Sequence, residues 1–347
     1  MKITGAEAIL RCLQAEGVDT IFGYPGGAIM PVYDALYQFD DQLKHVLTRH
    51  EQGAIHAAQG FARAGQTVGV CFATSGPGAT NLITGLADAM IDSTPLVCIT
   101  GQVHSSLLGT DAFQETDVVG ISMPVTKWNG QITKASNIPS VLAKAFYVAR
   151  SGRPGPVLVD ITKDAQFEYF DFQYEKCTGL RSYQPKPVVD YTKVTRAAKW
   201  INEAQKPLLL IGQGIILSQA EQALCQFLET TDIPTAWTLL GLSALATDHP
   251  LNVGMLGMHG NYAPNVKTNE CDLLIAVGMR FDDRVTGDTS RYANQAKIIH
   301  IDLDPAEINK NIKADLGIVG DAKHVLELLN QLCKKSCLLY TSPSPRD

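Results

Sequence analysis

Residues 45–64 read HVLTRHEQGAIHAAQGFARA, an apolar strand-like run followed by a small-residue helical run. The run at 45–48 predicts a strand and residues 54–64 predict a helix. Between them stands Glu51, a carboxylate where the strand gives way to the helix. From position alone, Glu51 is either a solvated charge or an ion-pair partner, here of Arg49 or Arg63.

Two further loops share this setting. FGYPGG at residues 22–27 and ATSGPGATN at residues 73–81 each follow an apolar run and precede a helical one. In a parallel sheet such loops gather at the carboxyl edge, where open α/β folds bind ligands. The sequence therefore predicts that Glu51 and these two loops share one site.

Residues 1–165 alternate between helix and strand patterns, which predicts a parallel βα domain. The expected elements are helix 4–16, strand 19–23, helix 30–38, strand 44–48, helix 52–64, strand 67–72, helix 78–91, strand 95–100, a short strand at 125–128, helix 139–151 and strand 157–161. Residues 166–189 lose the periodicity and contain Pro185-Lys186-Pro187, which favours an extended linker.

A second domain is expected at residues 190–335, again with alternating elements. Its predicted elements are helix 192–203, strand 207–212, helix 218–229, strands 233–237, 273–277 and 297–301, and helix 321–332. The predicted fold class is α/β, with two doubly wound parallel-sheet domains. Residues 336–347 (SCLLYTSPSPRD) have no helical or strand period and are interpreted as a foreign or misread tail.

The composition indicates a soluble, globular protein. With 347 residues, 45% hydrophobic and 18% charged, the chain can bury two ordinary cores. A net charge of −6 without charged blocks argues against nucleic-acid partners and a membrane-binding patch. The eight scattered cysteines are interpreted as small buried hydrophobes in a reducing compartment: Cys12, Cys71, Cys98, Cys177, Cys225, Cys271, Cys333 and Cys337.

The amino terminus predicts immediate folding. Thr4-Gly5-Ala6-Glu7 is a capping-box pattern, so a helix without a preceding signal or transit peptide is expected. Polar residues, Gly or Pro interrupt every apolar run well short of a membrane span. We therefore expect a cytoplasmic, bacterial-type protein.

The three loops resemble the pyrimidine-binding domain of thiamine-diphosphate enzymes, specifically the catalytic subunit of acetolactate (acetohydroxyacid) synthases, and the resemblance extends to about residue 333. It implies that Glu51 hydrogen-bonds N1′ of the cofactor's aminopyrimidine and so promotes loss of the thiazolium C2 proton. Gln could not take this proton, and Asp would be one methylene short. The implied thiamine-diphosphate residues are Tyr24, Pro25, Gly26, Glu51, Pro77, Asn81 and Gln114.

The resemblance implies decarboxylation of pyruvate and ligation to a second 2-keto acid, pyruvate or 2-ketobutyrate, at the start of branched-chain amino-acid synthesis. The loop with Phe113 and Gln114 and the segment Val125-Thr126-Lys127 would reach the active site of a neighbouring subunit. The implied substrate residues are Gly27, Ala28, Phe113, Lys127 and Arg280. For Phe113 a loop anchor, and for Lys127 a solvated charge, remain alternatives.

The second domain resembles the flavin-binding domain of the same enzymes. Gly212-Gln213-Gly214 alone is a weak nucleotide signal because position 217 is Leu. Arginines suit flavin or phosphate groups, glycines allow backbone approach, and Asp can accept from ribose. The predicted FAD residues are Arg153, Gly212, Gly214, Met258, His259, Gly260, Gly278, Arg280, Asp282, Arg284, Asp302 and Asp321.

Two alternatives stand beside the FAD interpretation. His259 could be a turn residue, and Asp282, Asp283 and Arg284 could form a surface ion-pair cluster. The resemblance implies a structural flavin without a net redox role.

The family's metal ligands lie in a third domain with a Gly-Asp-Gly and a downstream Asn pair. Gly287-Asp288-Thr289 and Gly320-Asp321-Ala322 do not match it, so no Mg²⁺ ligand is predicted here. A domain of roughly 200 residues is expected to be absent and the chain alone inactive. The implied partners are further copies, as a homodimer or tetramer, and a small regulatory subunit.

Other functions remain open. Another FAD-containing thiamine enzyme, such as a pyruvate oxidase, would share much of this pattern, although RFDDRVTG at 280–287 favours the synthase. Glyoxylate carboligase is disfavoured, because that branch lacks the Glu that Glu51 supplies. A non-catalytic flavin-binding or regulatory half-protein would keep Glu51 as a relic.

Overall fold

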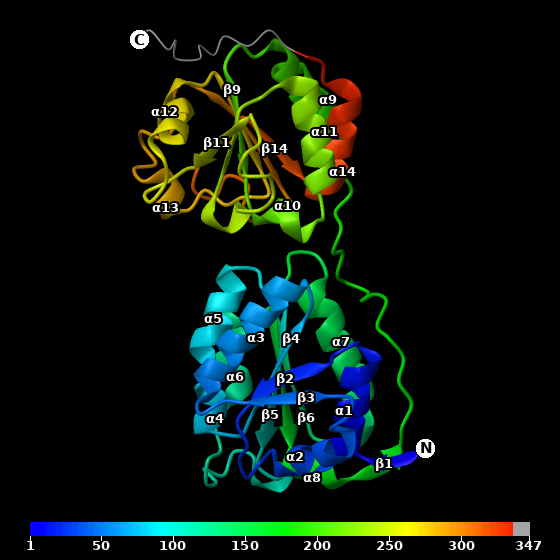
Figure 1. Cartoon of the computed structure of the whole chain (residues 1–347). Helices are drawn as coiled ribbons and strands as arrows, with labels where there is room; N and C mark the ends of the chain where they lie inside the picture. Colours follow the sequence, from blue (N-terminus) through cyan, green and yellow to red (C-terminus); the bar gives the residue numbers. More distant parts are fainter. Residues whose placement is uncertain (336–347) are drawn as a thin grey trace. The chain divides into compact units, whose positions relative to one another are not determined.

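The computed structural model describes residues 1–335 in two units, Met1–Pro185 and the chain from Lys186 onward (Figure 1). The tail predicted at 336–347 lies outside the described residues. Each unit is built on its own six-stranded sheet, and every strand pair within these two sheets is parallel. The predicted α/β class with two doubly wound parallel sheets is confirmed.

The first unit orders its sheet β3-β2-β4-β5-β7-β6. In chain order its elements are β1 (Lys2–Thr4), α1 (Gly5–Ala15), β2 (Thr20–Gly23), α2 (Met30–Leu36), η1 (Tyr37–Phe39), β3 (Lys44–Leu47), α3 (Glu51–Gly65), β4 (Gly69–Ala73), α4 (Pro77–Thr80), α5 (Ile83–Ile91), β5 (Leu96–Gln102), η2 (Ser105–Leu107), α6 (Val118–Ser122), η3 (Met123–Val125), β6 (Trp128–Ile132), η4 (Ala135–Asn137), α7 (Ile138–Arg150), β7 (Pro156–Thr162), α8 (Lys163–Phe167) and β8 (Tyr169–Asp171).

Successive residues of the central strands pack alternately into two hydrophobic cores, one on each face of the sheet. Val70 and Phe72 of β4 pack with α1, α2 and α7, whereas Cys71 and Ala73 pack with α3 and α5. Figure 1 shows these helices on opposite faces of the sheet. Because both faces are covered, β4, β5 and β7 are buried at every position, as expected for a parallel sheet.

The second unit orders its sheet β11-β10-β9-β12-β13-β14. Its elements are α9 (Tyr191–Glu203), β9 (Pro207–Ile211), α10 (Gln213–Leu217), α11 (Glu221–Thr231), β10 (Thr235–Trp237), η5 (Leu239–Gly241), β11 (Asn252–Met255), α12 (Tyr262–Glu270), β12 (Leu273–Val277), α13 (Asp283–Thr286), β13 (Lys297–Asp302), β14 (Leu316–Val319) and α14 (Ala322–Leu332). Numbered along the unit, this is the order 3-2-1-4-5-6 of dinucleotide-binding sheets, and the strand order reverses between β9 and β12.

Several sequence predictions were wrong in detail. The strand expected at 125–128 begins only at Trp128, because Met123–Val125 forms a 3-10 turn around Pro124. The single helix expected at 78–91 divides into α4 and α5, and Leu82 N bonds to Ala79 O across the break. The helix expected at 218–229 begins later, as α11, because α10 precedes it.

The segment predicted as an irregular linker at 166–189 begins with regular structure. Its first residues complete α8, and β8 then pairs antiparallel with β1 at the amino terminus. A three-residue edge pair carries too few residues for a period-two pattern, so periodicity could not reveal it.

Seven cysteines lie in the described part of the chain and all are free thiols. Cys12, Cys71, Cys98, Cys271 and Cys333 are buried, as predicted, while Cys177 and Cys225 are half-buried. Among residues 1–335 no helix is both long and apolar enough to cross a bilayer.

Candidate functional site

Glu51 is the first residue of α3 and is only 7% exposed. The first turn of a helix stabilises negative charge, so this position suits a carboxylate that has left bulk water. Asn81 Nδ2 donates a 2.9 Å hydrogen bond to Glu51 Oε2. Glu51 is therefore oriented by a neutral amide.

The structure contradicts both alternatives for Glu51, the solvated charge and the ion pair with Arg49 or Arg63. The side chain is not a solvated surface charge, and Arg63 pairs with Asp92 at 2.6 Å instead. No salt bridge joins Arg49 to Glu51 among the ion pairs of the described chain. Glu51 instead lies in a buried polar cluster with Asn81.

The three predicted loops do converge on Glu51. A Cβ built on Gly78 would lie 3.2 Å from Glu51 Oε1, and one on Gly26 would lie 2.4 Å from Cβ of Thr74. Thr74 Oγ1 accepts from Ala28 N at 3.2 Å. Thr74 thus joins the loop after β2 to the loop after β4, a role that the sequence prediction missed although the residue lies within its motif.

The outer part of this cluster is open. Tyr24, Pro25, Gly27 and Pro77 are exposed, and no atom lies within 4 Å of a Cβ built on Gly27. Ala28 is buried beneath them. Their exposure leaves the backbone accessible at Gly27, and the pocket wall assigned to these residues stays a prediction.

The loop between β5 and α6 also reaches the cluster. Gly76 has φ +55°, and a Cβ on it would lie 2.6 Å from Gln114 O. Gln114 is itself in the left-handed region, with φ +58°, whereas the neighbouring Phe113 is 87% exposed. Gln114 is therefore packed by its backbone, and Phe113 is free to contact another molecule, which contradicts the loop-anchor alternative.

Lys127 is not part of this cluster. It precedes β6 at the amino edge of the sheet, where its N–H bonds to Pro156 O, whereas Glu51 and the loops lie at the carboxyl edge. Its Nζ donates to Val148 O at 2.6 Å, to Tyr183 OH at 2.8 Å and to Ser151 O. Lys127 is half-buried and ties the segment carrying Tyr183 to α7, which contradicts the solvated-charge alternative. Its role toward substrate in a neighbouring subunit stays a prediction.

Burial lowers the pKa of Lys127 from 10.5 to about 8. Between these values the unfolded chain holds a proton that the folded chain has lost, so stability rises with pH across this window. We expect Lys127→Met to remove that rise, about 2 kcal/mol of unfolding free energy. Urea unfolding curves of both proteins at pH 8 and 10.5 measure it, and equal pH dependence would contradict the prediction.

In the second unit, glycines bring two loops together at the reversal between β9 and β12. A Cβ on Gly212 would lie 2.4 Å from Gly278 O, and one on Gly214 would lie 2.5 Å from Gly278 Cα. Gly214 N donates to Gly278 O at 2.9 Å, and Gly278 has φ +58°. Only glycines permit this close backbone packing.

The remaining predicted residues of this unit follow the carboxyl ends of neighbouring strands. Arg280 follows β12 and lies 3.8 Å from Asp282, which caps α13 by accepting from Arg284 N. Met258 N donates to Arg284 O at 2.7 Å, joining the two segments. His259 is exposed in the adjoining turn, where a Cβ on Gly260 would meet Met255 O.

Two predicted acidic residues have local structural roles. Asp302 ends β13 and accepts from Asp304 N at 2.8 Å, while Asp321 caps α14 by accepting from His324 N. Both still lie at the carboxyl edge of the sheet. The turn at η5 was missed: a Cβ on Gly241 would lie 3.0 Å from Gly212 Cα, and this glycine was visible in the sequence.

Arg153 belongs to the first unit, unlike the other predicted FAD residues. Its Nε donates to Ser93 Oγ at 2.8 Å, and its Nη2 to Ile91 O at 3.4 Å. Within its own unit, Arg153 therefore stabilises the end of α5 through these hydrogen bonds.

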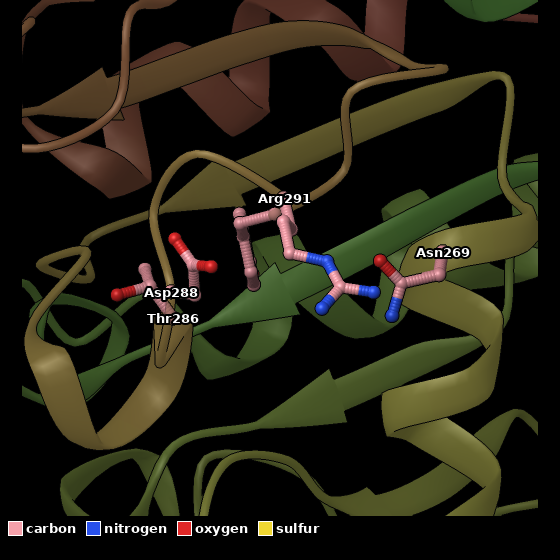
Figure 2. A pocket seen from close by; sticks show the side chains of 5 residues that line it. Asn269, Thr286, Asp288 and Arg291 are labelled. Carbon is pink, nitrogen blue, oxygen red and sulfur yellow. The ribbon is translucent and has the colours of Figure 1, made fainter.

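A hollow of about 360 Å³ also opens in the second unit, and none of the predicted site residues lines it. Figure 2 shows the side chains of Asn269, Thr286, Asp288 and Arg291 around it, and Tyr292 completes the lining. Arg291 is therefore a guanidinium of this unit outside the predicted site.

Comparisons with known proteins match both units. Residues 3–121 match the thiamine pyrophosphate enzyme N-terminal TPP binding domain, and residues 194–329 match the thiamine pyrophosphate enzyme central domain. The chain is 54% identical over 325 residues, 93% of its length, to a probable acetolactate synthase large subunit of Methanocaldococcus jannaschii, covering 55% of that protein.

Two further relatives agree. The large subunit of acetolactate synthase isozyme 2 of Escherichia coli is 51% identical over 95% of this chain and 59% of its own length. The acetolactate synthase large subunit of Corynebacterium glutamicum is 52% identical over 96% of this chain and 53% of its own. The chain thus spans about half the length of the curated relatives it matches.

Proposed function

Because this chain belongs to the thiamine pyrophosphate enzymes and is similar to acetolactate synthase large subunits, we propose that it serves in the synthesis of acetolactate. The reaction would decarboxylate pyruvate and join the remaining two-carbon unit to a second 2-keto acid, pyruvate or 2-ketobutyrate. It is the first common step of branched-chain amino-acid synthesis. The observation that carries the proposal is the buried Glu51, oriented by Asn81 among three converging loops.

The cluster fits the aminopyrimidine of thiamine diphosphate. Asn81 occupies Glu51 Oε2, so Oε1 is the atom that would share a proton with the ring nitrogen. Gly27, whose Cβ position has no atom within 4 Å, and the exposed Pro77 leave the outer side of the cluster open to a flat ring. Burial of Glu51 keeps competing water from this proton. Once bound, the cofactor supplies the electron sink for decarboxylation.

The same chain would supply part of the substrate pocket. Tyr24, Gly27 and Ala28 would form its wall, and the exposed Phe113 would pack against substrate in a neighbouring subunit. Gln114 would approach the cofactor through the contact of its backbone with Gly76. Separately, in the second unit, Arg280 is proposed as a positive charge that would attract the carboxylate of a 2-keto acid.

The second unit fits a dinucleotide, and we assign FAD to it. The reversal between β9 and β12 is where such sheets bind dinucleotides, and Gly212, Gly214 and Gly278 bring the two loops that border it into close backbone contact. Met258, His259, Gly260, Arg280, Asp282, Arg284, Asp302 and Asp321 would complete the site within this unit. The flavin would be structural.

Further properties of the whole protein are proposed with this function. Residues 1–165 would bind the pyrimidine and residues 190–335 the flavin, joined by 166–189. Mg²⁺ is proposed as a further cofactor; within residues 1–335 no group of three or more His, Cys, Asp or Glu side chains could hold a metal ion. The relatives are named as large subunits, which supports a small regulatory partner, and pairing of large subunits in the cytoplasm is expected.

The test is the product made from pyruvate. A chimera would carry the 325 matched residues of this chain in place of the corresponding part of the Methanocaldococcus jannaschii relative. With thiamine diphosphate, Mg²⁺ and FAD we expect acetolactate without oxygen consumption. Oxygen-dependent formation of acetyl phosphate would instead indicate a pyruvate oxidase, and a folded chimera without turnover would refute the assignment of this chain.

A further inference from the structure

The loop of residues 103–117 carries Phe113 and Gln114, and both of its ends are held by one buried side chain. Gln102, at the end of β5, is 1% exposed. Its Oε1 accepts from Val103 N at 2.9 Å, and its Nε2 donates to Thr116 O at 3.0 Å. A backbone N–H can only donate and a carbonyl can only accept, so the orientation of this amide is fixed.

The fixed amide directs its second N–H to Asp160. Gln102 Nε2 donates to Asp160 Oδ2 at 3.0 Å. Asp160 lies on β7 without exposed surface and also accepts from Thr100 Oγ1 at 2.7 Å and from Gln131 Nε2 at 2.9 Å. The carboxyl group thus joins β5, β6 and β7 and holds Gln102 in place.

Two further carboxylates bind this loop at other places, Asp164 from α8 and Glu115 from the loop itself. Asp164 binds the N–H and hydroxyl of Ser105, which fixes the first arm, and Glu115 accepts from amides within the loop tip. The second arm, which leads from Gln114 to Thr116, is tied to the sheet through Gln102. Gln114 O packs against Gly76, next to the segment that contacts Glu51.

We propose that the buried Asp160–Gln102 pair is the anchor that positions the Phe113–Gln114 arm at the Glu51 cluster, which makes Asp160 a positioning residue. The relation to catalysis rests on the proposed function, whereas the anchoring itself does not. Neither residue touches Glu51, so both act through the loop.

The anchor requires a hydrogen-bond acceptor oxygen at position 160 and does not require a negative charge there. Burial raises its pKa, and the hydrogen bonds from Thr100, Gln131 and Gln102 oppose that rise. The two amides need one acceptor oxygen, at Oδ2, whereas the Thr100 hydroxyl can accept as readily as donate. Asn at position 160 therefore satisfies every partner, with its Nδ2 donating to Thr100.

Amide hydrogen exchange of the whole chain without cofactors tests the anchor. We expect Asp160→Leu and Gln102→Leu, which remove the tie at similar volume, to speed exchange within residues 112–117 roughly tenfold. Asp160→Asn should retain wild-type exchange there. Thr100→Val is the matched control, because it removes a hydrogen bond of the same buried carboxyl group without releasing Gln102.

The proposal fails if Gln102→Leu is folded and residues 112–117 exchange at the wild-type rate. It also fails if Asp160→Asn or Thr100→Val loosens the loop as much as the leucine variants do. If Asp160→Leu does not fold, Gln102→Leu and Asp160→Asn still decide the matter. Since no cofactor or substrate is present, a chimera that makes no acetolactate would leave this result unchanged.

Discussion

Replacing Glu51 with Gln in the chimera is expected to lower acetolactate formation by about 10²–10⁴-fold, the range of a lost general acid–base group. Gln keeps the volume and can still accept from Asn81 at the position of Oε2. Its NH₂ group cannot exchange a proton where Oε1 stood. The loss should therefore appear in kcat, with the fold intact, and steady-state kinetics with pyruvate measure it.

Glu16→Gln is the matched control for this substitution. Glu16 is also a buried carboxylate of the first unit, but it pairs with Arg150 and Tyr174 instead of contacting the loops. It should cost stability and leave kcat per folded molecule near the parent value. A Glu51→Gln chimera with the kcat of the parent would contradict the assigned role.

Replacing Arg280 with Ala is expected to raise the dissociation constant of FAD about 10- to 100-fold. A hydrogen bond from a guanidinium to an anionic oxygen contributes about 1.5–3 kcal/mol, and each 1.4 kcal/mol is a factor of ten. Its ion pair with Asp282, at 3.8 Å on a partly exposed surface, contributes little to the fold. Quenching of flavin fluorescence on titration with the chain measures the change.

Arg291→Ala separates a specific contact from the general effect of one positive charge. Arg291 belongs to the same unit but lines the hollow of Figure 2, outside the predicted FAD site. Removing this side chain should change the dissociation constant of FAD less than threefold, roughly the effect of removing one screened surface charge. Equal effects of the two substitutions, or no binding by the parent chain, would refute the FAD assignment.

The sequence predicted the strands that are buried at every position. Continuous apolar runs such as 96–99 and 273–277 are typical of strands covered on both faces of a parallel sheet. It missed α12 and β14. The sequence YAPNVKTNE of α12 buries only Pro264 and Thr268, so no helical period marks it. LGIV in β14 is a short run with an internal glycine, and its pairing with β13 stabilises it.

The part of the site that is formed by loops at the carboxyl ends of strands could be predicted from the sequence. Strand ends in a parallel sheet share an edge, so Glu51, Gly26 and Asn81 were placed together correctly. Lys127 lies apart from this cluster because it precedes its strand rather than following it, which puts it at the opposite edge of the sheet. Contacts between residues far apart in the sequence, such as Asp160 with Gln102 on the neighbouring strand, leave no local pattern in the sequence.

The most direct test of the account is the rate at which the C2 proton of thiamine diphosphate exchanges with deuterated water in the chimera, compared between Glu51 and Glu51→Gln. If Glu51 acts on the pyrimidine as proposed, the Gln variant should exchange about 10²–10⁴-fold more slowly while still binding the cofactor. Equal exchange rates in the two proteins would show that Glu51 does not activate the cofactor and would contradict the central claim.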